Sequence, residues 1–597
     1  MNEGNQDLKI DDTNPKATKL EQDLKEAATV EGWTAKARLV LLGYQDPELS
    51  KIQTASPTLG RATRSVLLSM AAHNAWPVRS LDARAAFLSG ETNKARSRPL
   101  YMTLPKTWAE ELGLPSRSLF RLIKSAYGLA EAPRAWFDTL CKALKSIGFR
   151  QSYTDPCAFT LPPNQSDWKE WRRQQALSAS QRRAIPKDQL YPDDFDNCAC
   201  LGGIGVHVDD LLMLGSHRRF SEKVRELQKL LPFGSLKSGA LTFTGVEISQ
   251  ASDGTIYVGQ PKYAKKLEEV VIKDVSFGPK GIVTKSGETK FRAVIGALLW
   301  LSVQTRPDLA FDVSYWASHA ATATRDTFLQ LNKCVRRAKQ QADLNLVYRK
   351  VVANWGDLRC YGFSDAGEGS RKSGLSQAGS VVLLGHKSGL DGAGVRGLLL
   401  DSRSDKITRA CRSSFRAELE AMQSTVDLVE ALSFQIEDLS RNVEPLEWLR
   451  TYGRTSDARA VIIDAKGLYE GLRNEKKPSP TGERGRLATW ILLRQNLASL
   501  RVAVYWVNSE HMLADAMTKL SEKCPGAHVT FRTFLKTGTF RISYDALSAR
   551  RTHQQRLGQP PIAEEEVDEM SEIQNRHTQS YQSMKLKLHT NRWKSWE

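Results

Sequence analysis

The alternation of polar and apolar positions divides the amino-terminal part of the chain into a leader and a globular region. Residues 1–32 are polar and charged, and a strand-like apolar run at 37–42 marks the start of the globular part. From there to about residue 160, short apolar strands alternate with helical segments. One helix is predicted between Pro133 and Gly148, because proline is tolerated in a first helical turn and glycine is favoured just past a helix end. Its apolar residues share one face: Trp136, Phe137, Leu140 and Leu144.

Residues 161–197 interrupt this pattern. The stretch is rich in Gln, Arg, Pro and Asp, and we interpret it as a loop-like surface insertion, which can be long because closure entropy grows slowly with loop length. Apolar order returns at 201–214, where a hairpin is predicted with Asp209 and Asp210 in its turn. The elements predicted next are a helix with Phe220, Val224, Leu227 and Leu231 at helical spacing, a strand at 241–248, and helix-rich sequence from 288 to 345.

A second α/β unit is predicted from about 357 to 520. Its long helix, at 413–436, carries an apolar stripe and should pack on the sheet of the unit. The stripe consists of Phe415, Leu419, Met422, Val426 and Val429, and strands are expected at 360–365, 378–400, 459–463 and 501–507. Residues 521–597 are polar, with one strand-like patch at 539–544, and we expect the last forty to be disordered.

Composition and charge narrow the class of protein. Lys and Arg total 85 against 67 Asp and Glu, a formal net charge of +18, which indicates either a polyanionic partner or an ordinary solvated surface. Eight cysteines without a CxxC pair form neither a disulfide framework nor a zinc ribbon, which favours a reducing compartment. No secretory signal and no apolar run of about 20 residues is present, so we expect an intracellular, soluble protein of the cytoplasm or nucleus without a membrane partner.

The first candidate site combines one isolated carboxylate with two adjacent ones. Asp82 ends a strand-like segment, whereas Asp209 and Asp210 lie in the predicted hairpin turn. Nucleotidyl transfer uses two Mg²⁺ about 4 Å apart, and carboxylates from neighbouring strands are suitable ligands. Taken alone, an Asp-Asp pair at a turn usually serves to stabilise the turn through hydrogen bonds to the backbone. An Asp at a strand end is usually a cap or a surface group.

The second candidate site consists of four acidic residues, each at the boundary of a predicted element. They are Asp365, Glu418, Asp464 and Asp515. Four such groups can converge on two Mg²⁺ and cleave a phosphodiester with metal-activated water. Glu420, on the same helix as Glu418, is an alternative of the same type, and an exposed helix charge is the ordinary interpretation of either glutamate. His511, four residues before Asp515, is a weaker candidate for a proton shuttle.

Several further segments, in their order along the chain, resemble one family. The resemblance is collinear from about Lys36 to Lys519, and the segments that carry it are 36–40 (KARLV), 81–90 (LDARAAFLSG), 125–129 (SAYGL), 132–136 (APRAW), 155–157 (DPC), 243–248 (FTGVEI) and 305–308 (TRPD). The chain thereby resembles the Pol polyprotein of copia-type (Pseudoviridae) LTR retrotransposons, over its reverse transcriptase and ribonuclease H region. The four acids of the second site match the ribonuclease H positions, and Glu418 rather than Glu420 matches the catalytic glutamate.

The resemblance implies roles for particular residues. Asp82, Asp209 and Asp210 would form the metal-binding triad of the polymerase. Phe87 would be the aromatic that discriminates against a ribose 2′-hydroxyl, although a core aromatic is an equal alternative. The other substrate-binding positions would be Lys36 and Arg38, which would contact the incoming triphosphate unless they are ordinary basic surface, together with Tyr127, Gly128 and His207. His207 stands where the family generally has tyrosine, and Glu131 where it has glutamine.

The resemblance also implies a fold, cofactors and partners. We expect an α/β and α+β multidomain chain, in which a right-hand polymerase with a helical thumb or connection precedes a ribonuclease H-like α/β domain. The expected divisions are a leader at 1–32, fingers and palm at 33–250 with the insertion 161–197, a thumb or connection at 251–350, the ribonuclease H-like domain at 357–520 and a polar tail at 521–597. Two Mg²⁺ per active site are implied, with Mn²⁺ as an alternative. The implied partners are an RNA template, a DNA primer, RNA–DNA hybrid, dNTPs and other Pol or Gag products.

Two alternatives to the full enzyme stay open. In the family several strands of the fingers precede the 36–40 motif, where this chain has the polar leader, so the fingers are expected to be incomplete. The chain would then be a non-catalytic nucleic-acid-binding remnant, or a protein with ribonuclease H activity alone. The presence of all seven acidic residues favours the RNA-directed DNA polymerase with hybrid-specific ribonuclease H activity.

Overall fold

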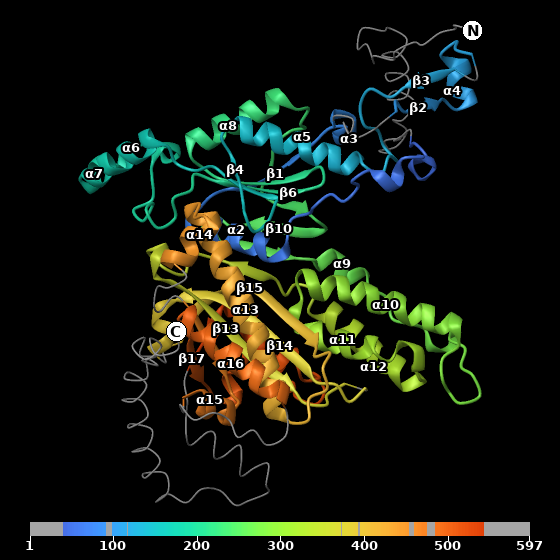
Figure 1. The fold of residues 1–597 in the computed structure, drawn as a ribbon, viewed down its shortest axis with the longest axis vertical. Coiled ribbons are helices and arrows are strands. Elements are labelled where there is room, and N and C mark those ends of the chain that lie inside the picture. The colour runs from blue at the N-terminus through green and yellow to red at the C-terminus, as the bar shows by residue number, and fades with distance from the viewer. Residues whose placement is uncertain are drawn as a thin grey trace, which may run out of the picture.

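The computed structural model places the described residues in several sheets with helices packed around them (Figure 1). The described residues are 40–90, 98–115, 118–371, 373–391, 394–452, 459–473 and 484–542. The predicted leader, Lys36, Arg38 and the last forty residues lie outside these ranges. Within them, no helix combines the length and the apolar character that crossing a bilayer requires. The described elements agree with the predicted α/β and α+β multidomain class.

The first sheet, which we call the palm sheet, has six strands in the order β4-β5-β6-β7-β1-β8. Its strands are β1 (Val78–Asp82), β4 (Arg150–Gln151), β5 (Ala158–Thr160), β6 (Gly203–His207), β7 (Asp210–Leu214) and β8 (Lys237–Ser238). Because successive strand residues point to opposite faces, β7 divides its apolar residues between two cores. Leu211 and Met213 face the core under the helices α5 (Ala132–Ser146) and α8 (Arg218–Leu230), and Leu212 and Leu214 face α2 (Arg61–His73).

The predicted helix and hairpin of this region are present. In α5 a proline lies in the first turn, and Trp136, Leu140 and Leu144 are buried, as the helical spacing predicted. The hairpin joins β6 to β7. A small two-stranded sheet, β2 (Tyr101–Thr103) with β3 (Leu119–Arg121), lies with α4 (Lys106–Glu111) at the far end of the molecule (Figure 1).

The segment 161–197 differs from the predicted loop, because it contains helices and has an aromatic core. Its helices are α6 (Gln165–Gln175) and α7 (Ala179–Arg183), and each begins with a capping box. Phe195 contacts Trp168 and Trp171, with ring centroids 5.2 and 6.2 Å away. The Tyr191 hydroxyl donates to Asp167 at 2.8 Å. The polar residues around the two tryptophans conceal this helical spacing in the sequence.

A four-stranded antiparallel sheet, β12-β11-β10-β9, follows the palm sheet. Its strands are β9 (Leu241–Phe243), β10 (Val246–Gln250), β11 (Ile256–Gly259) and β12 (Leu346–Tyr348). The single strand predicted at 241–248 is therefore two strands. Thr244 and Gly245 between them have φ of 51° and 74°, and two successive positive φ values are typical of a type I′ hairpin turn. The predicted division at residue 250 falls within this sheet, since β10 pairs with β11.

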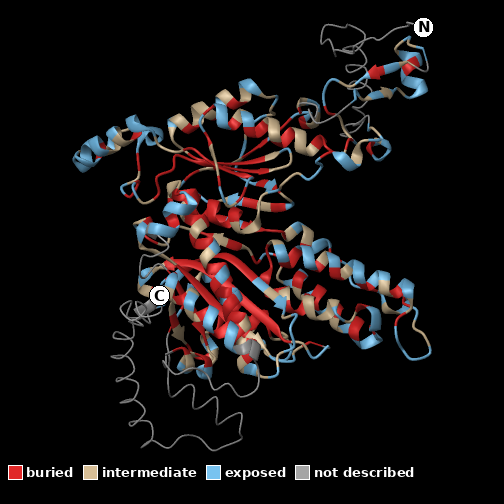
Figure 2. Cartoon of the chain, in the orientation of Figure 1, coloured by how far each residue is buried: buried red, intermediate tan, exposed pale blue. Residues whose placement is uncertain are grey.

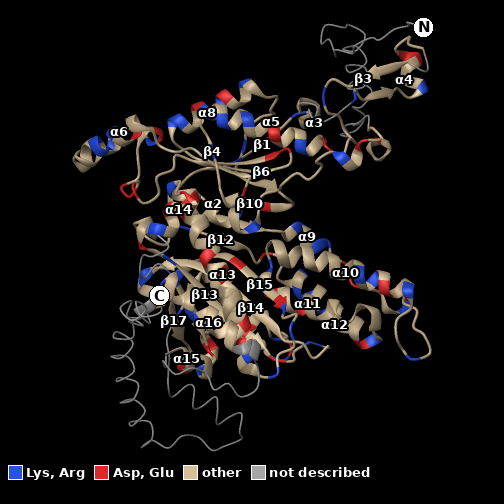
Figure 3. Cartoon of the chain, viewed as in Figure 1, with Lys and Arg blue, Asp and Glu red and all other residues tan. Residues whose placement is uncertain are grey.

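Helices fill most of the segment between β11 and β12, as the sequence predicted. They are α9 (Pro261–Lys266), α10 (Lys285–Gln304), α11 (Ala310–Ala317) and α12 (Arg325–Gln340). Their apolar residues form a core of their own, which includes Phe291, Leu298 and Phe328. In Figure 3 the Lys and Arg positions, coloured blue on the cartoon, are spread over several elements, including α6, α8, α9 and α10.

The last sheet, which we call the C-terminal sheet, has the order β17-β16-β13-β14-β15-β18. Strands β13 to β15 are antiparallel, whereas β13, β16 and β17 are parallel. The strands are β13 (Leu358–Gly367), β14 (Gln377–His386), β15 (Val395–Lys406), β16 (Arg459–Ile463), β17 (Ala503–Trp506) and β18 (Thr539–Phe540). Strands β13 to β17, in the order β17-β16-β13-β14-β15, have the strand order of a ribonuclease H fold.

Helix α13 (Ser414–Arg441) covers β13 and β14 and buries most of its length, as Figure 2 shows. It begins at the Ser413 cap and ends at Asn442, whose φ of 59° stops the helix. The other helices of this unit include α15 (Lys466–Arg473), α16 (Arg484–Ser499) and α17 (Pro525–Thr537).

The first part of the predicted tail belongs to the C-terminal sheet. Strand β18 pairs with β15, and the Phe540 ring lies 5.1 Å from Tyr361 and 6.0 Å from Phe363. Helix α17 buries Phe531 and Phe534 nearby. Described structure of the C-terminal sheet therefore continues beyond the division predicted at residue 521. Short apolar segments inside polar sequence gave too weak a signal to place it.

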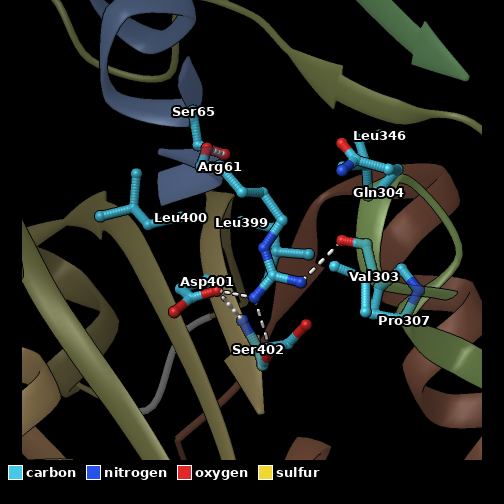
Figure 4. A pocket seen from close by; sticks show the side chains of 10 residues that line it. All are labelled: Arg61, Ser65, Val303, Gln304, Pro307, Leu346, Leu399, Leu400, Asp401 and Ser402. Carbon is cyan, nitrogen blue, oxygen red and sulfur yellow. Dashed lines mark hydrogen bonds and ion pairs between the residues drawn. The ribbon is translucent and has the colours of Figure 1, made fainter. Parts of the chain in front are cut away.

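The palm sheet and the C-terminal sheet are joined by buried polar contacts through α2 and α13. Asp438 of α13 is fully buried, and its carboxylate pairs with Arg150 at 2.6 Å. It also accepts hydrogen bonds from Ser152, Tyr153 and Thr154 at the edge of the palm sheet. On α2, Arg61 pairs with Asp401 of β15 and donates to two carbonyls around a cavity of about 10 Å³ (Figure 4). This interface fixes the two sheets relative to each other.

We expect Asp438→Ala to lower the free energy of unfolding by about 3 kcal/mol. Removal of this carboxylate leaves Arg150 and several buried donors without their acceptor. The measurement is denaturant unfolding followed by tryptophan fluorescence. Asp427→Ala, an exposed position on the same helix, is the control and should change stability by less than about 0.5 kcal/mol. Equal effects of the two substitutions would contradict the importance of the interface.

Candidate active sites

The palm sheet brings Asp82 and Asp210 to neighbouring positions. Strand β1 pairs with β7, and in the register of that pairing Asp82 lies directly opposite Asp210. Opposite residues of paired strands carry their side chains on the same face, with Cβ atoms about 5 Å apart. Asp209 lies in the adjoining turn and is exposed, and its carbonyl accepts from the Ala83 amide at 3.0 Å. Three predicted site residues therefore lie at one end of the sheet.

The turn that presents Asp209 and Asp210 is strained and is held from behind. Val208 has φ of 58°, a conformation that is unfavourable for a β-branched residue. Its carbonyl accepts a hydrogen bond of 2.8 Å from the indole nitrogen of Trp136, which is completely buried in α5. Trp136 was predicted as a core residue only, and no signal in the sequence pointed to this contact with the turn.

A groove of about 390 Å³ begins at this end of the sheet. It is lined by residues from β1, β7 and β8 and from the sheet formed by β9 to β11, including Asp82, Asp210, Lys237, Tyr257 and Lys262. Burial, together with the charges of Asp209 and Asp82, raises the pKa of Asp210, and Lys237 partly opposes this shift. Carboxylates and lysines in one groove can hold a cation and a phosphate backbone respectively.

The other predicted polymerase residues lie around the turn. The Phe87 and Tyr127 rings are in edge contact, with centroids 5.3 Å apart. Gly128 has φ of 91°, and a Cβ there would lie 2.0 Å from the Leu41 carbonyl oxygen, so the position requires glycine. Burial is the main cause that lowers the pKa of His207, which is therefore a neutral ring beside Phe243. Lys36 and Arg38 lie outside the described residues.

Two of the motif segments have a structural role. The Asp155 carboxylate accepts from the Gly60 amide at 2.8 Å and the Thr63 hydroxyl at 2.6 Å, at the start of α2. Arg306 is completely buried, makes two hydrogen bonds to Asp308, and donates to the carbonyls of Ala338 and Gln341. These contacts explain the two motifs by packing, without reference to a substrate.

The C-terminal sheet brings three of its four predicted acids together. Among the described residues, one group of three potential metal-ligating side chains lies within 4.8 Å of one another, and it consists of Asp365, Glu418 and Asp464. Asp365 lies near the end of β13, Glu418 in the first turns of α13, and Asp464 directly after β16. Because β13 and β16 are parallel neighbours, the two aspartates leave the same edge of the sheet. The ligand atoms of Asp82, Asp209 and Asp210 do not form such a group.

The electrostatics of this group are those of a cation site. Burial and mutual repulsion with the neighbouring carboxylates raise the pKa values of Asp365 and Glu418. One Glu418 oxygen is buried and has no hydrogen-bond partner among the described residues. Oxygen ligands, together with a buried carboxylate oxygen that has no partner among the described residues, suit a hard divalent cation, so these side chains fit Mg²⁺.

The fourth predicted acid, Asp515, lies outside the group. It is buried in the 3-10 helix Leu513–Met517, and one of its oxygens lies 2.7 Å from the Lys519 ammonium nitrogen. Lys519 also lies 3.8 Å from Asp365, and the Thr518 hydroxyl donates to Asp365. Sequence reasoning missed both residues, although Lys519 follows Asp515 at the spacing that favours ion pairs on a helix.

Glu420 and His511, the other candidates named from the sequence, lie outside the acidic group. Glu420 pairs with Arg416 and accepts from the Thr489 hydroxyl, so it is engaged away from the acidic group. His511 lies 3.7 Å from Glu510 and is not part of the group. The Ser509 hydroxyl donates to Asp464 at 2.7 Å and positions its carboxylate.

A sheet with carboxylates at a hairpin turn, joined to a ribonuclease H-like sheet, is the arrangement of the reverse transcriptase class. Residues 10–161 match the family described as reverse transcriptase (RNA-dependent DNA polymerase). The chain is 24% identical over 525 residues to the retrovirus-related Pol polyprotein from transposon RE2 of Arabidopsis thaliana, covering 85% of this chain and 31% of that protein. It is 23% identical over 501 residues to the transposon Ty1-LR2 Gag-Pol polyprotein of Saccharomyces cerevisiae, covering 81% of this chain and 25% of the relative.

These relatives confirm the predicted resemblance to copia-type Pol polyproteins, and the chain spans less than a third of their length. Among solved structures, the foamy viral protease-reverse transcriptase in complex with RNA/DNA hybrid gives a TM-score of 0.38 at 11% identity, over 76% of this chain and 46% of that chain. The N-terminal RNase H domain of a Mycobacterium tuberculosis protein, fused to maltose binding protein, gives 0.19 at 17% identity, over 29% and 98%.

Proposed function

We propose that this chain is an RNA-directed DNA polymerase that also cleaves the RNA of an RNA–DNA hybrid. The observation that carries the proposal is the gathering of Asp365, Glu418 and Asp464 within 4.8 Å, in a chain whose residues 10–161 match the reverse transcriptase family. The pairing of Asp82 with Asp210 across β1 and β7 supports a separate site for polymerisation. The substrates would be an RNA template, a DNA primer, dNTPs and the hybrid product.

The residues divide the work between binding cations and holding nucleic acid. Asp82, Asp209 and Asp210 would hold Mg²⁺ in the groove, and Asp365, Glu418 and Asp464 would hold it at the C-terminal sheet. Bound Mg²⁺ would activate the attacking oxygen and neutralise charge on the phosphate, and Mn²⁺ could replace it. Lys237 and Lys262 line the same groove as Asp82 and would contact a phosphate backbone. Phe87 and Tyr127 form an aromatic pair that would border the sugar of an incoming nucleotide.

The direct test measures both activities on the purified chain with Mg²⁺. A labelled DNA primer on an RNA template reports extension, and RNA labelled within a hybrid reports cleavage. Both activities are expected, and EDTA should abolish both. Hybrid binding without either activity would instead indicate a non-catalytic nucleic-acid-binding remnant.

A second candidate function is cleavage of hybrid RNA without polymerisation. It is favoured by one observation, namely that the ligand atoms of Asp82, Asp209 and Asp210 do not close to within 4.8 Å as those of the C-terminal group do. The same two assays separate the candidates, because this alternative requires cleavage with no extension of the primer.

We expect Trp136→Phe to lower kcat for primer extension by about tenfold, with little change in KM for dNTP. The substitution removes one hydrogen bond, worth about 1–1.5 kcal/mol, that holds the strained Val208 turn in front of Asp209. Steady-state kinetics measure the two constants. Trp171→Phe is a matched control, since its indole donates to the Pro192 carbonyl at 3.1 Å within the 161–197 segment. A similar loss of kcat in both variants would mean that Trp136 acts only on general stability.

A further inference from the structure

The acidic group of the C-terminal sheet already contains a cation of the chain's own. The Lys519 ammonium nitrogen lies 2.7 Å from an Asp515 oxygen and 3.8 Å from an Asp365 oxygen. It therefore lies between the fourth predicted acid and the group of three. Asp515 is engaged with this ammonium instead of joining Asp365, Glu418 and Asp464.

The backbone around Lys519 holds the ammonium in this place. The Lys519 amide donates to the Asp515 carbonyl at 3.0 Å, which sets the two side chains on one face of the turn. The Lys519 carbonyl accepts a hydrogen bond of 2.7 Å from the completely buried His528 of α17. On the preceding residue, the Thr518 hydroxyl binds Asp365 itself. Lys519 is thus a positioned charge and differs from a surface lysine that happens to lie near acids.

Two buried carboxylate oxygens are available as ligands for a metal ion. One oxygen of Glu418 and one of Asp515 are buried without a hydrogen-bond partner among the described residues. The Glu418 oxygen belongs to the group of three, which is open to a divalent cation. The other Asp515 oxygen is the one bonded to Lys519, so Asp515 can become a ligand only if a second cation competes with the ammonium.

We infer that Lys519 occupies the place of a second cation, so that the folded site binds one divalent ion, on Asp365, Glu418 and Asp464. This inference rests on the proposed function of that site. Two cations about 4 Å apart repel each other strongly in a partly buried site. A second divalent ion must therefore displace the ammonium before Asp515 can bind it, and Lys519 acts as a positioning residue that sets how many ions the site holds.

The experiment counts bound Mn²⁺ by the loss of the free-ion paramagnetic resonance signal, without nucleic acid. The parent is the full chain carrying Asp209→Asn and Asp210→Asn, which remove two of the three proposed ligands of the other site. Only ions whose binding is lost on adding Asp365→Asn are counted, because Asp365 belongs to the group of three and also lies beside the Lys519 ammonium. One such ion is expected in the parent and two in Lys519→Met, which keeps an unbranched side chain one atom shorter and removes its charge.

Two further variants test the role of charge. Lys519→Arg retains the positive charge and should bind one ion, as the parent does. Lys523→Met, at an exposed lysine four residues further along the chain, should also leave the count at one. Thermal unfolding of each variant without metal checks that it is folded.

The possible outcomes distinguish the inference from the function on which it rests. Two ions in the parent, or an unchanged count of one in folded Lys519→Met, would overturn the inference and leave the proposed hybrid cleavage intact. An absence of any ion that depends on Asp365 would overturn the proposed function of the site as well. The result of the parent chain alone can overturn the inference if Lys519→Met does not fold.

Discussion

We expect Asp209→Asn to reduce primer extension on an RNA template by about a thousandfold or more, and to leave cleavage of hybrid RNA unchanged. The amide has the shape of the carboxylate but lacks the charge that holds a divalent cation, and loss of a group that acts only in the chemical step falls on kcat. Asp209 is exposed in its turn, so the substitution should not disturb folding. Single-turnover extension and hybrid cleavage, measured on one preparation, give both rates.

The reciprocal substitution completes this test. Glu418→Gln should reduce the rate of hybrid cleavage by a similar factor and leave extension unchanged, because Glu418 belongs to the acidic group of the C-terminal sheet. Asp188→Asn, at an exposed position in the 161–197 segment, is a control for loss of a surface carboxylate. Extension that survives Asp209→Asn would remove the polymerase assignment, and loss of both activities in either variant would contradict two independent sites.

Arg306→Met lowers the free energy of unfolding by about 3–5 kcal/mol. The guanidinium is buried with Asp308, and its removal leaves a buried carboxylate and two carbonyls without their donor. Burial works against ionisation of Asp308, but Arg306, Arg337 and Arg532 hold the pKa of its carboxyl below the ordinary value. The charged form is therefore the native one, and it depends on this partner.

Denaturant unfolding of the single and double variants measures this effect. Arg306→Met combined with Asp308→Leu removes both charges and should be less destabilising than Arg306→Met alone, because no buried charge is left unpaired. If the double variant is as unstable as the sum of two separate losses, the two side chains do not act as a pair.

Much of the fold follows from local pattern. The stripe on α13, the apolar face of α5 and the β6–β7 hairpin were all predicted from periodicity, because each buries one face against a sheet. The type I′ turn at Thr244 was missed, since a threonine at positive φ gives no sequence signal. Helix α6 was missed because its two tryptophans lie among glutamines and arginines that dominate the composition.

The candidate sites also combine features that local sequence patterns predicted with features that depend on tertiary contacts. Periodicity predicted the elements that carry Asp82 and Glu418. Asp210, predicted in the hairpin turn, is instead the first residue of β7, and β13 continues for two residues beyond Asp365, which was predicted to end its strand. The pairing of Asp515 with Lys519 follows the i, i+4 spacing of helical ion pairs. Its position beside Asp365 depends on packing of the Leu513–Met517 helix against β13, β14 and α17, and no local pattern contains that information. Arg64 of α2 was not recognisable as a buried residue, because its partners Thr244 and Gln304 come from distant parts of the chain.

The contact of Asp438 with the palm sheet has a consequence for substrates that are longer than either site. If a duplex occupied both candidate sites, the number of base pairs between them would be fixed by this contact, because Asp438 of α13 is bound to Arg150 and Ser152 at the edge of the palm sheet. Under the proposed function, this fixed spacing would set the lengths of the RNA fragments released behind a growing DNA strand, independently of the nucleotide sequence.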